Sequence, residues 1–183
     1  MTLRADARRN RDRLLAVAGE VVAEQGADAS LEEIARRAGV GSATLHRHFR
    51  SRQALLEDVF RDRVAALCAH GEELLTDPNA GAALTTWLHA VVTHAATNRG
   101  LAPALAMSAD PTLGSSAHTA ILTTGGALLN RAQQHDQVRP DLTIGELFRL
   151  VSGIATGTEQ DPPQATRLLT LALEGVGYRP PEQ

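Results

Sequence analysis

The sequence predicts an all-α fold of about nine helices, with a small N-terminal helix-turn-helix unit followed by a larger helical unit. Three observations lead to this prediction. Apolar residues recur at helical spacing through almost every segment, and no segment shows a convincing strand pattern. Glycine and proline stand between these segments, where helices end or begin. Aromatic residues make up only 3% of the chain and apolar residues 43%, so the core is built mainly from Leu, Val, Ile and Ala.

The first predicted helix covers about residues 7–25 and follows an expected arm at residues 1–7. Gly26 ends it, because glycine enters the left-handed conformation without strain. Five arginines against two aspartates make the first 13 residues the basic end of a chain whose net charge is -3. A basic arm on a small domain suits nucleic acid. The apolar stripe of the helix is formed by Leu14, Leu15, Ala18, Val21 and Val22.

The second predicted helix is short and covers residues 31–38. Ser30 and Glu33 have the spacing of a capping box, in which the Ser30 hydroxyl accepts from the Glu33 amide and the Glu33 carboxylate reaches back. Gly39 ends the helix and starts a tight turn. We therefore expect the chain to enter the next helix at once.

The third predicted helix lies within residues 41–49, where Leu45 and Phe49 share one apolar face. Its other edge carries small, polar and cationic side chains. Two short helices joined by a glycine-containing turn are typical of a helix-turn-helix, whose second helix enters a DNA groove. Ser51 is the expected N-cap of the helix that follows.

The fourth predicted helix covers about residues 52–75 and, at 1.5 Å per residue, is roughly 36 Å long. It is long enough to leave the N-terminal unit and enter a second one. The later helices are predicted over residues 80–98, a short segment around 101–107, 115–134, a segment capped by Thr143, and a last segment opened by Pro162 and Pro163.

Several classes of protein are excluded by absent patterns. No apolar run is long enough to span a membrane, and the arginine-rich N-terminus lacks the apolar stretch of a secretory signal. A single cysteine cannot form an internal disulfide, which fits the cytoplasm. The sequence contains no HExxH, GxSxG, GxGxxG or P-loop motif. We expect no enzyme, no cofactor, no metal site and no membrane contact.

Residues 8–60 resemble the N-terminal domain of the TetR family of bacterial transcriptional regulators. The matching segments run without gaps over residues 29–40, 43–49 and 51–56. The family commonly has Tyr where this chain has His46 and often Lys where it has Arg52. The resemblance implies a DNA-binding domain at residues 1–55 and a helical effector-binding and dimerisation domain at residues 56–183. It also implies a homodimer that leaves DNA when a small molecule binds.

The resemblance assigns roles to residues of the N-terminal domain. Ala43 offers a methyl group to thymine, and Arg47 offers a guanidinium fork to guanine. For each assigned residue the alternative is an ordinary solvated side chain. The implied base-reading residues are Ser42, Ala43, Thr44 and Arg47; the implied phosphate contacts are Ser30, His46, His48 and Arg52; the arm contributes Arg8 and Arg9, together with Arg4 and Arg11.

The last two helices are the expected dimer interface. One recognition helix reads few bases, so a twofold dimer on a palindromic operator would read two half-sites about 34–36 Å apart or a multiple of that. Both helices combine apolar faces with small residues that permit close approach. The alternative is packing within one chain. The expected interface residues are Leu147, Phe148, Val151, Ile154, Leu168, Leu169 and Ala172.

Control by a small-molecule effector requires a pocket in the helices between the DNA-binding domain and the dimer interface. The alternatives are ordinary core for the Trp and Met and ordinary surface for the histidines. The candidate pocket residues are Trp87, His89, His94, Met107, His118 and Leu122. We therefore expect a cytoplasmic, nucleoid-associated DNA-binding repressor released by an unknown ligand. The alternative is a constitutive DNA-binding regulator without an effector.

Overall fold

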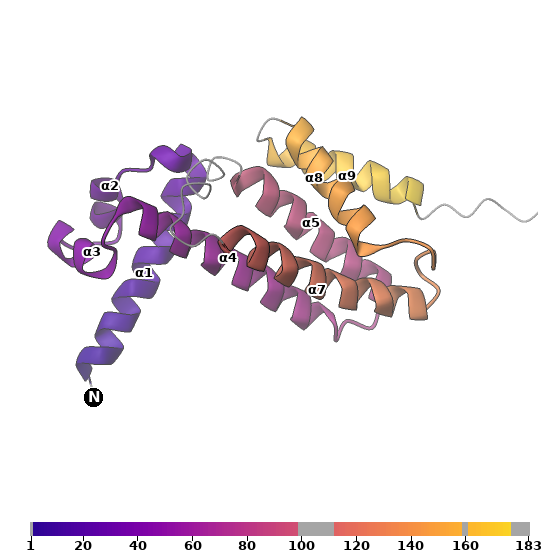
Figure 1. Ribbon diagram of the computed structural model, residues 1–183, viewed down its shortest axis with the longest axis horizontal. Coiled ribbons are helices and arrows are strands. Elements are labelled where there is room, and N and C mark those ends of the chain that lie inside the picture. The colour runs from indigo at the N-terminus through magenta and orange to yellow at the C-terminus, as the bar shows by residue number, and fades with distance from the viewer. Residues whose placement is uncertain (1, 99–111, 159–160, 177–183) are drawn as a thin grey trace, which may run out of the picture. The chain divides into compact units, whose positions relative to one another are not determined.

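The computed structural model describes residues 2–98, 112–158 and 161–176 of the 183-residue chain. These ranges hold eight α-helices, one short 3-10 helix and no strand, which confirms the all-α prediction (Figure 1). The short segment expected around residues 101–107 lies outside them. No helix in the described ranges is long and apolar enough to cross a membrane. The elements are α1 (Thr2–Gln25), η1 (Gly26–Asp28), α2 (Leu31–Arg37), α3 (Ser42–His48), α4 (Arg52–Leu74), α5 (Ala80–Asn98), α7 (Leu113–Gln134), α8 (Ile144–Gly157) and α9 (Pro162–Val176).

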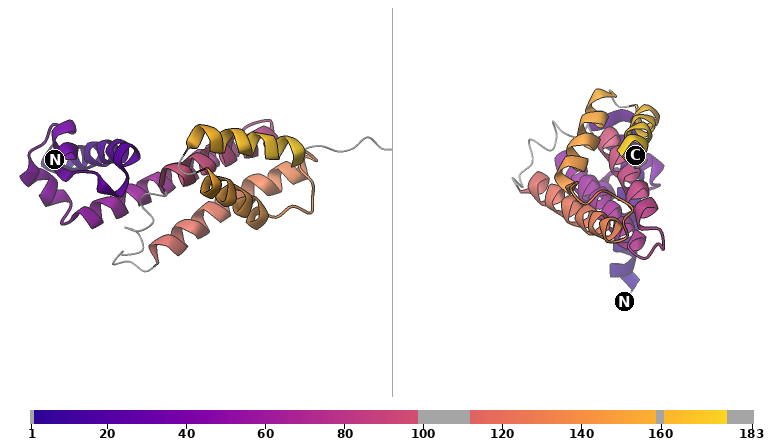
Figure 2. Two further views of the ribbon diagram at one scale, coloured as in Figure 1. Left: turned by 90° about the horizontal axis from the view of Figure 1, so that it is seen from above. Right: turned by 90° about the vertical axis from the view of Figure 1, so that its right-hand side faces the viewer.

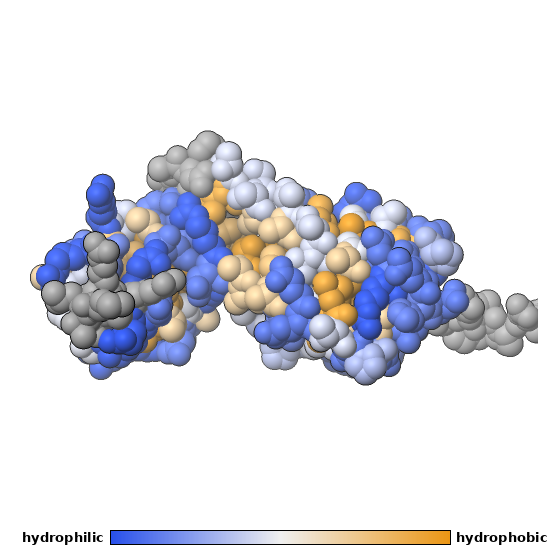
Figure 3. Space-filling view, turned by 90° about the horizontal axis from the view of Figure 1, so that it is seen from below, coloured by the Kyte–Doolittle hydropathy of each residue, from blue (hydrophilic) through white to orange (hydrophobic). Residues whose placement is uncertain are grey.

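The chain forms two compact units. The N-terminal unit holds the residues up to Arg63 together with Asn98 and residues 112–114, and the C-terminal unit holds residues 64–97 and those from Ser115 onward. The division therefore falls within α4, the helix in which the domain boundary is predicted at residues 55 and 56. On the face shown in Figure 3, polar residues dominate the N-terminal unit, whereas apolar residues gather in patches on the C-terminal unit.

The N-terminal unit is built around the predicted apolar stripe of α1. One continuous core joins this stripe to buried side chains of α2, α3 and the start of α4. Phe49 lies in this core, as predicted. The expected arm at residues 1–7 is wrong, because α1 is already helical from Thr2. Leu, Ala and Arg are strong helix formers, and no glycine or proline lies among residues 1–18, so nothing stops the helix from extending to its start.

Two glycines set the turns of the N-terminal unit. Gly26 follows α1 with φ of 66°, and Gly39 follows α2 with φ of 65°. A side chain in this left-handed region is strained, so glycine is the residue suited to both positions. The turn after Gly39 delivers the chain directly into α3.

The core of the C-terminal unit is organised by Trp87 on α5, which is only 1% exposed. Its indole Nε1 donates a hydrogen bond to the Leu67 carbonyl oxygen of α4, at 3.1 Å. A Cβ atom at Gly71 would lie 2.7 Å from that Nε1, and one at Gly125 would lie 2.5 Å from Cζ3 of the same ring. The two glycines therefore allow α4 and α7 to close on the indole from different sides.

Helices α8 and α9 pack against each other in the C-terminal unit (Figures 1 and 2). Thr143 begins α8 with a complete capping box, because its hydroxyl accepts from the Glu146 amide while the Glu146 carboxylate accepts from the Thr143 amide. Asp161 caps α9 through the Gln164 amide, at 3.0 Å. Both helices thus begin where the sequence predicts.

The glycine pair in α7 provides a matched test of the packing around Trp87. We expect Gly125→Ala to destabilise the fold by roughly 1–3 kcal/mol, because the methyl group would overlap the buried, hydrogen-bonded ring of Trp87 and the Ile144 side chain. Gly126→Ala should stabilise it by about 0.4–1 kcal/mol, because the nearest atom would be Cγ2 of Ile144 at an ordinary 4.0 Å. Urea denaturation at one fixed protein concentration measures both. Equal effects of the two substitutions would contradict this packing.

Candidate nucleic-acid interface

Helix α3 is held by one buried edge and exposes the other. Leu45 and Phe49 are each 1% exposed, which fixes the helix on the core of the N-terminal unit. The predicted base-reading residues Ser42, Ala43 and Arg47 are exposed, as is His46, whereas Thr44 and His48 are half-buried. Gly41 caps the helix without a side-chain hydrogen bond. The six candidate side chains of α3 therefore surround an edge that is open to a ligand.

Two side chains of that edge are joined to each other. The Arg47 Nη2 donates a hydrogen bond to the Thr44 hydroxyl oxygen at 3.0 Å. This bond holds the guanidinium along the exposed edge of α3 and occupies one of its five donors. A base edge or phosphate oxygen can therefore meet a positioned fork rather than a freely rotating chain.

Only one of the two hydrogen bonds of the predicted capping box is present at the start of α2. The Ser30 hydroxyl oxygen accepts from the Glu33 amide at 3.4 Å, as predicted. The Glu33 carboxylate does not reach back to Ser30. It binds the guanidinium groups of Arg36 and Arg37 instead, because two cations offer stronger, charge-assisted hydrogen bonds than one amide. The Ser30 hydroxyl donates its proton to Oε2 of Glu32, at 2.9 Å.

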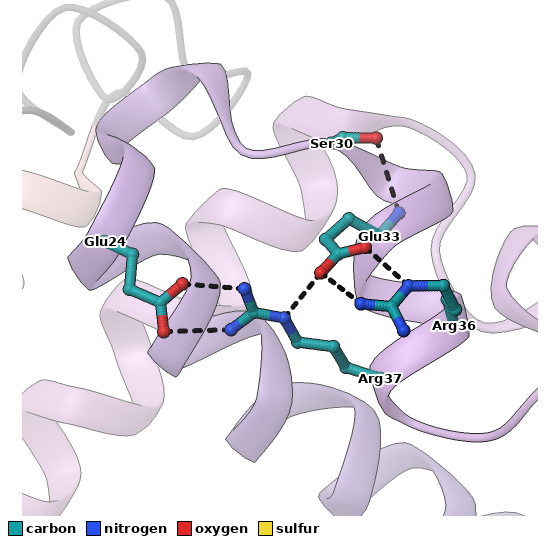
Figure 4. Close-up of polar contacts among 5 residues, drawn as sticks. All are labelled: Glu24, Ser30, Glu33, Arg36 and Arg37. Carbon is teal, nitrogen blue, oxygen red and sulfur yellow. Dashed lines mark hydrogen bonds and ion pairs between the residues drawn. The ribbon is translucent and has the colours of Figure 1, made fainter.

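An ion-pair network ties α2 to α1 (Figure 4). Arg37 lies between Glu24 of α1, with Nη2 2.8 Å from Oε2, and Glu33 of α2, with Nε 2.7 Å from Oε1. Arg36 adds a second fork on the same Glu33 carboxylate. Hydrogen bonds from Arg36 first and then Arg37 lower the pKa of Glu33 from 4.5 to about 2. The orientation of α2 is thereby fixed by charge as well as by apolar packing.

Arg11, which is predicted to reach DNA from the N-terminal arm, instead contacts side chains of its own unit. Its Nη2 lies 2.7 Å from Oδ2 of Asp58 on α4, and its guanidinium lies over the Phe49 ring at 5.6 Å from the centroid. It therefore stabilises the base of α3. Arg9 is exposed on α1, whereas the side chain of Arg8 lies outside the described part of the chain.

Arg52 lies at the first residue of α4. Ser51 caps this helix as predicted, because its hydroxyl accepts from the Ala54 amide at 3.1 Å. The Arg52 Nη2 is 3.6 Å from Oδ1 of Asp28, a fully exposed carboxylate. At this distance the ion pair is weak and solvent-screened, so Arg52 can exchange it for a phosphate.

Glu32 is a residue of this surface that the sequence prediction missed. Its carboxylate is exposed, accepts the Ser30 proton, and is close enough to His46 for that ring to affect it electrostatically. The N-cap residue Ser30 and His46 of α3 thus both act on one exposed carboxylate. The sequence does show Glu32 two positions after the N-cap residue Ser30. An acidic residue at this position is ordinarily interpreted only as stabilising the positive end of the helix dipole.

The candidate pocket residues are spread over the C-terminal unit. Trp87 belongs to the packed core described above. Leu122 and His94 are half-buried, whereas His118 is exposed and meets the Phe148 ring edge-to-face at 4.8 Å between centroids. Met107 lies outside the described residues. His89 is half-buried, with Nε2 3.4 Å from the Thr170 hydroxyl. The described residues contain no group of three or more His, Cys, Asp or Glu that could hold a metal ion.

Some of the candidate dimer residues are buried within the chain, and the others are partly or largely exposed. Leu147, Val151 and Leu169 are buried within their own chain. Phe148, Ile154 and Ala172 are half-buried. Leu168 is 40% exposed, and Leu171, which the prediction omitted, is 53% exposed. Leu171 follows Leu168 by three residues and so lies on the same helical face, a spacing that would have identified it.

Comparisons with known proteins match both parts of the chain. Residues 14–59 match the family model described as bacterial regulatory proteins, tetR family. Residues 79–178 match the model described as transcriptional regulator SbtR-like, C-terminal domain. Among curated proteins no relative matches.

Solved structures give the same result along most of the chain. A TetR transcriptional regulator from Streptomyces coelicolor is 36% identical, with a TM-score of 0.80 over 94% of this chain and 99% of that one. A TetR transcription regulatory protein from Mycobacterium vanbaalenii is 35% identical, with a TM-score of 0.77 over 96% and 99%. The regulator FadR from Bacillus subtilis, solved in complex with stearoyl-CoA, shares the fold at 18% identity, with a TM-score of 0.63 over 90% and 96%.

The Glu33 network predicts a defined pH dependence of stability. Because the folded protein holds the pKa of Glu33 at about 2, against 4.5 for the free group, the ionised form stabilises the fold above pH 4.5. This contribution is lost as the pH falls from 4.5 towards 2. We expect Glu33→Gln to flatten the pH dependence of unfolding in that window, measured by urea denaturation. Glu20→Gln, at an exposed site on α1, should keep the slope of the unmodified protein. Parallel slopes for all three proteins would contradict the assignment.

Proposed function

Because the chain belongs to the TetR family of bacterial transcriptional regulators, we propose that it is a sequence-specific DNA-binding repressor that acts on the nucleoid in the cytoplasm. The observation that carries this proposal is the exposed edge of α3. Buried Leu45 and Phe49 fix the helix, and Arg47 is exposed and hydrogen-bonded to Thr44. An edge of this kind supplies directional donors at the place where a major groove presents acceptors.

The side chains around α3 divide into two roles. Arg47 can donate two hydrogen bonds to guanine, and the exposed Ala43 methyl can contact the methyl group of thymine. Arg52 at the start of α4, His46 and the Ser30 hydroxyl lie at the flanks, where phosphates pass in a helix-turn-helix complex. The first group selects sequence, and the second positions the protein on any duplex.

Substitutions of the two arginines separate these roles. Arg47→Ala should remove the preference for one base in each half-site, at about 1–3 kcal/mol of discrimination, because a bidentate base contact is lost. Arg52→Ala should weaken operator and random DNA alike and lower the log–log salt slope by about one per protomer, because a phosphate contact is lost. Binding-site selection on the purified protein, followed by salt titrations, measures both.

Arg139→Ala serves as the control, because it removes the same charge from the loop between α7 and α8, where Arg139 pairs with Asp141. It should leave both the base preference and the salt slope unchanged. The division of roles fails if Arg47→Ala and Arg52→Ala change cognate and random binding by the same factors.

We further propose that the repressor is a homodimer formed through α8 and α9. Leu168 and Leu171 present an apolar edge of α9 to solvent. On α8, Gly153 and Gly157 have open space where a Cβ atom would lie, so packing within the chain does not require glycine there. Small residues on α8 and exposed leucines on α9, the helix packed against it, would allow a second pair of helices to approach closely. A twofold dimer would place two copies of α3 on two half-sites.

Leu171→Glu tests this interface. A carboxylate in an apolar twofold contact has no partner, so we expect dimer dissociation to become about 100-fold or more easier, with operator affinity falling in parallel. Sedimentation velocity gives the oligomeric state, and circular dichroism should show unchanged helix content. Ala127→Glu introduces the same charge at an exposed site on α7 and should remain dimeric. A Leu171→Glu protein that dimerises like the parent would exclude α9 as the interface.

We also propose that a small molecule releases the repressor from its operator. This proposal is supported by family membership and by the fold shared with a regulator solved with stearoyl-CoA. The alternative is a constitutive regulator with no effector. Trp87 is the only tryptophan of the chain and lies within the C-terminal unit, so its fluorescence reports on ligands there. A compound that both changes this fluorescence and lowers operator occupancy would support release by a small molecule over constitutive binding.

A further inference from the structure

The outward face of α9 carries the only two charged residues of that helix, and their charges have opposite signs. These residues are Arg167 and Glu174. Both are exposed, and neither makes a hydrogen bond or an ion pair within the part of the chain that the structure describes. The acidic groups at the starts of the two helices are used differently, because Glu146 caps α8 and Asp161 caps α9. The two charges of α9 are therefore left for a second molecule.

Arg167 and Glu174 lie on either side of Leu171 along one face of α9. Seven residues turn an α-helix by about 700°, so the two charged residues are about 20° apart around the axis and roughly 10 Å apart along it. This separation is too long for an ion pair within the helix. Leu171 lies about 40° from Arg167 and is 53% exposed. The face thus presents a cation, an exposed leucine and an anion in a row.

We propose that α9 pairs with α9 of a second copy of this chain in an antiparallel arrangement centred near Leu171, so that Arg167 of each protomer forms an ion pair with Glu174 of the other. This inference rests on the proposed homodimer and adds its orientation, its register and the basis of its partner choice. In a twofold contact, residue i meets residue j while j meets i. A charged face therefore fits itself when its opposite charges lie at similar distances from the axis. Arg167 lies four residues before Leu171 and Glu174 three residues after it, which meets this condition.

The charges distinguish the antiparallel pairing from its alternatives. A parallel pairing of α9 would place each Arg167 against the partner's Arg167 and each Glu174 against the partner's Glu174, and like charges repel. A helix of another protein without this arrangement would leave both charges unpaired in the contact, which disfavours it. The exposed leucines supply the apolar contact area, and the two symmetric ion pairs set orientation and partner choice, as charged pairs do beside the apolar seam of a coiled coil.

Exchanging the charges tests this pairing. Arg167→Glu alone and Glu174→Arg alone should each weaken homodimer formation roughly tenfold to 100-fold, because two ion pairs become two repulsive contacts. The two substitutions in one chain should restore the dissociation constant of the unmodified protein, because each pair re-forms with its signs exchanged. An equimolar mixture of the two single variants should form heterodimers in preference to either homodimer. These differences should shrink as the salt concentration rises.

Sedimentation equilibrium gives the dissociation constants, native mass spectrometry counts the heterodimers, and circular dichroism verifies the helix content of every variant. The matched controls are Arg13→Glu and Glu20→Arg, which make the same changes at the same spacing of seven residues on an exposed part of α1. Both controls should dimerise like the unmodified protein, and their mixture should give heterodimers in the statistical proportion.

The pairing is wrong if the single α9 variants dimerise as tightly as the unmodified protein, if their mixture gives only the statistical proportion of heterodimers, or if the double variant dimerises as weakly as the single ones. If Leu171→Glu still dissociates the dimer in these cases, the homodimer through α9 stands and only its charge pairing is refuted. If the unmodified protein is a monomer, the proposed homodimer fails first and this inference fails with it.

Discussion

The burial of Leu45 and Phe49 is the constraint on which the candidate interface depends. Helix α3 has only seven residues, too few for a stable helix on its own. Burying two large apolar side chains contributes about 1.5–3 kcal/mol each, which is enough to fix so short a segment. Their spacing of four residues places both on one edge, so the opposite edge must face outward. Exposure of Ser42, Ala43 and Arg47 follows from where the two anchors are buried.

The arginines of the N-terminal unit illustrate how one residue type divides between framework and surface. Arg11 and Arg37 bridge helices, the first to Asp58 and the second to Glu24 and Glu33. Arg47 bonds only within its own helix, to Thr44, and stays exposed. The framework arginines have carboxylates across the helix interface, which neutralise them and hold them in place. A count of basic residues therefore overstates the charge that a duplex would meet.

Most of the fold was predictable because its signals are local. Helix ends follow from glycines with positive φ and from hydroxyl caps such as Ser51 and Thr143, which act within three or four residues. The Glu33 carboxylate could join the capping box or pair with Arg36 and Arg37, three and four residues later, and the sequence alone does not decide between these local partners. The structure adds Glu24 of α1, which holds Arg37 in place. Likewise, the sequence identified Trp87 as a candidate pocket residue but did not reveal that Gly71 and Gly125 close upon it. The glycine stops and the hydroxyl caps were predicted correctly, whereas the choice of Glu33 between its cap and two neighbouring arginines, and the contacts of Trp87, required the structure.

Two consecutive glutamates of α2 show why that competition affects function. Glu32 and Glu33 are about 100° apart on the helix, so they meet different neighbours. Glu33 meets two guanidinium groups and becomes part of the rigid link to α1. Glu32 accepts from the Ser30 hydroxyl, which is a proposed phosphate contact, and His46 acts on it electrostatically. The first carboxylate is neutralised within the protein, whereas the second occupies the proton of the Ser30 hydroxyl, so a phosphate that binds Ser30 competes with Glu32 for that proton.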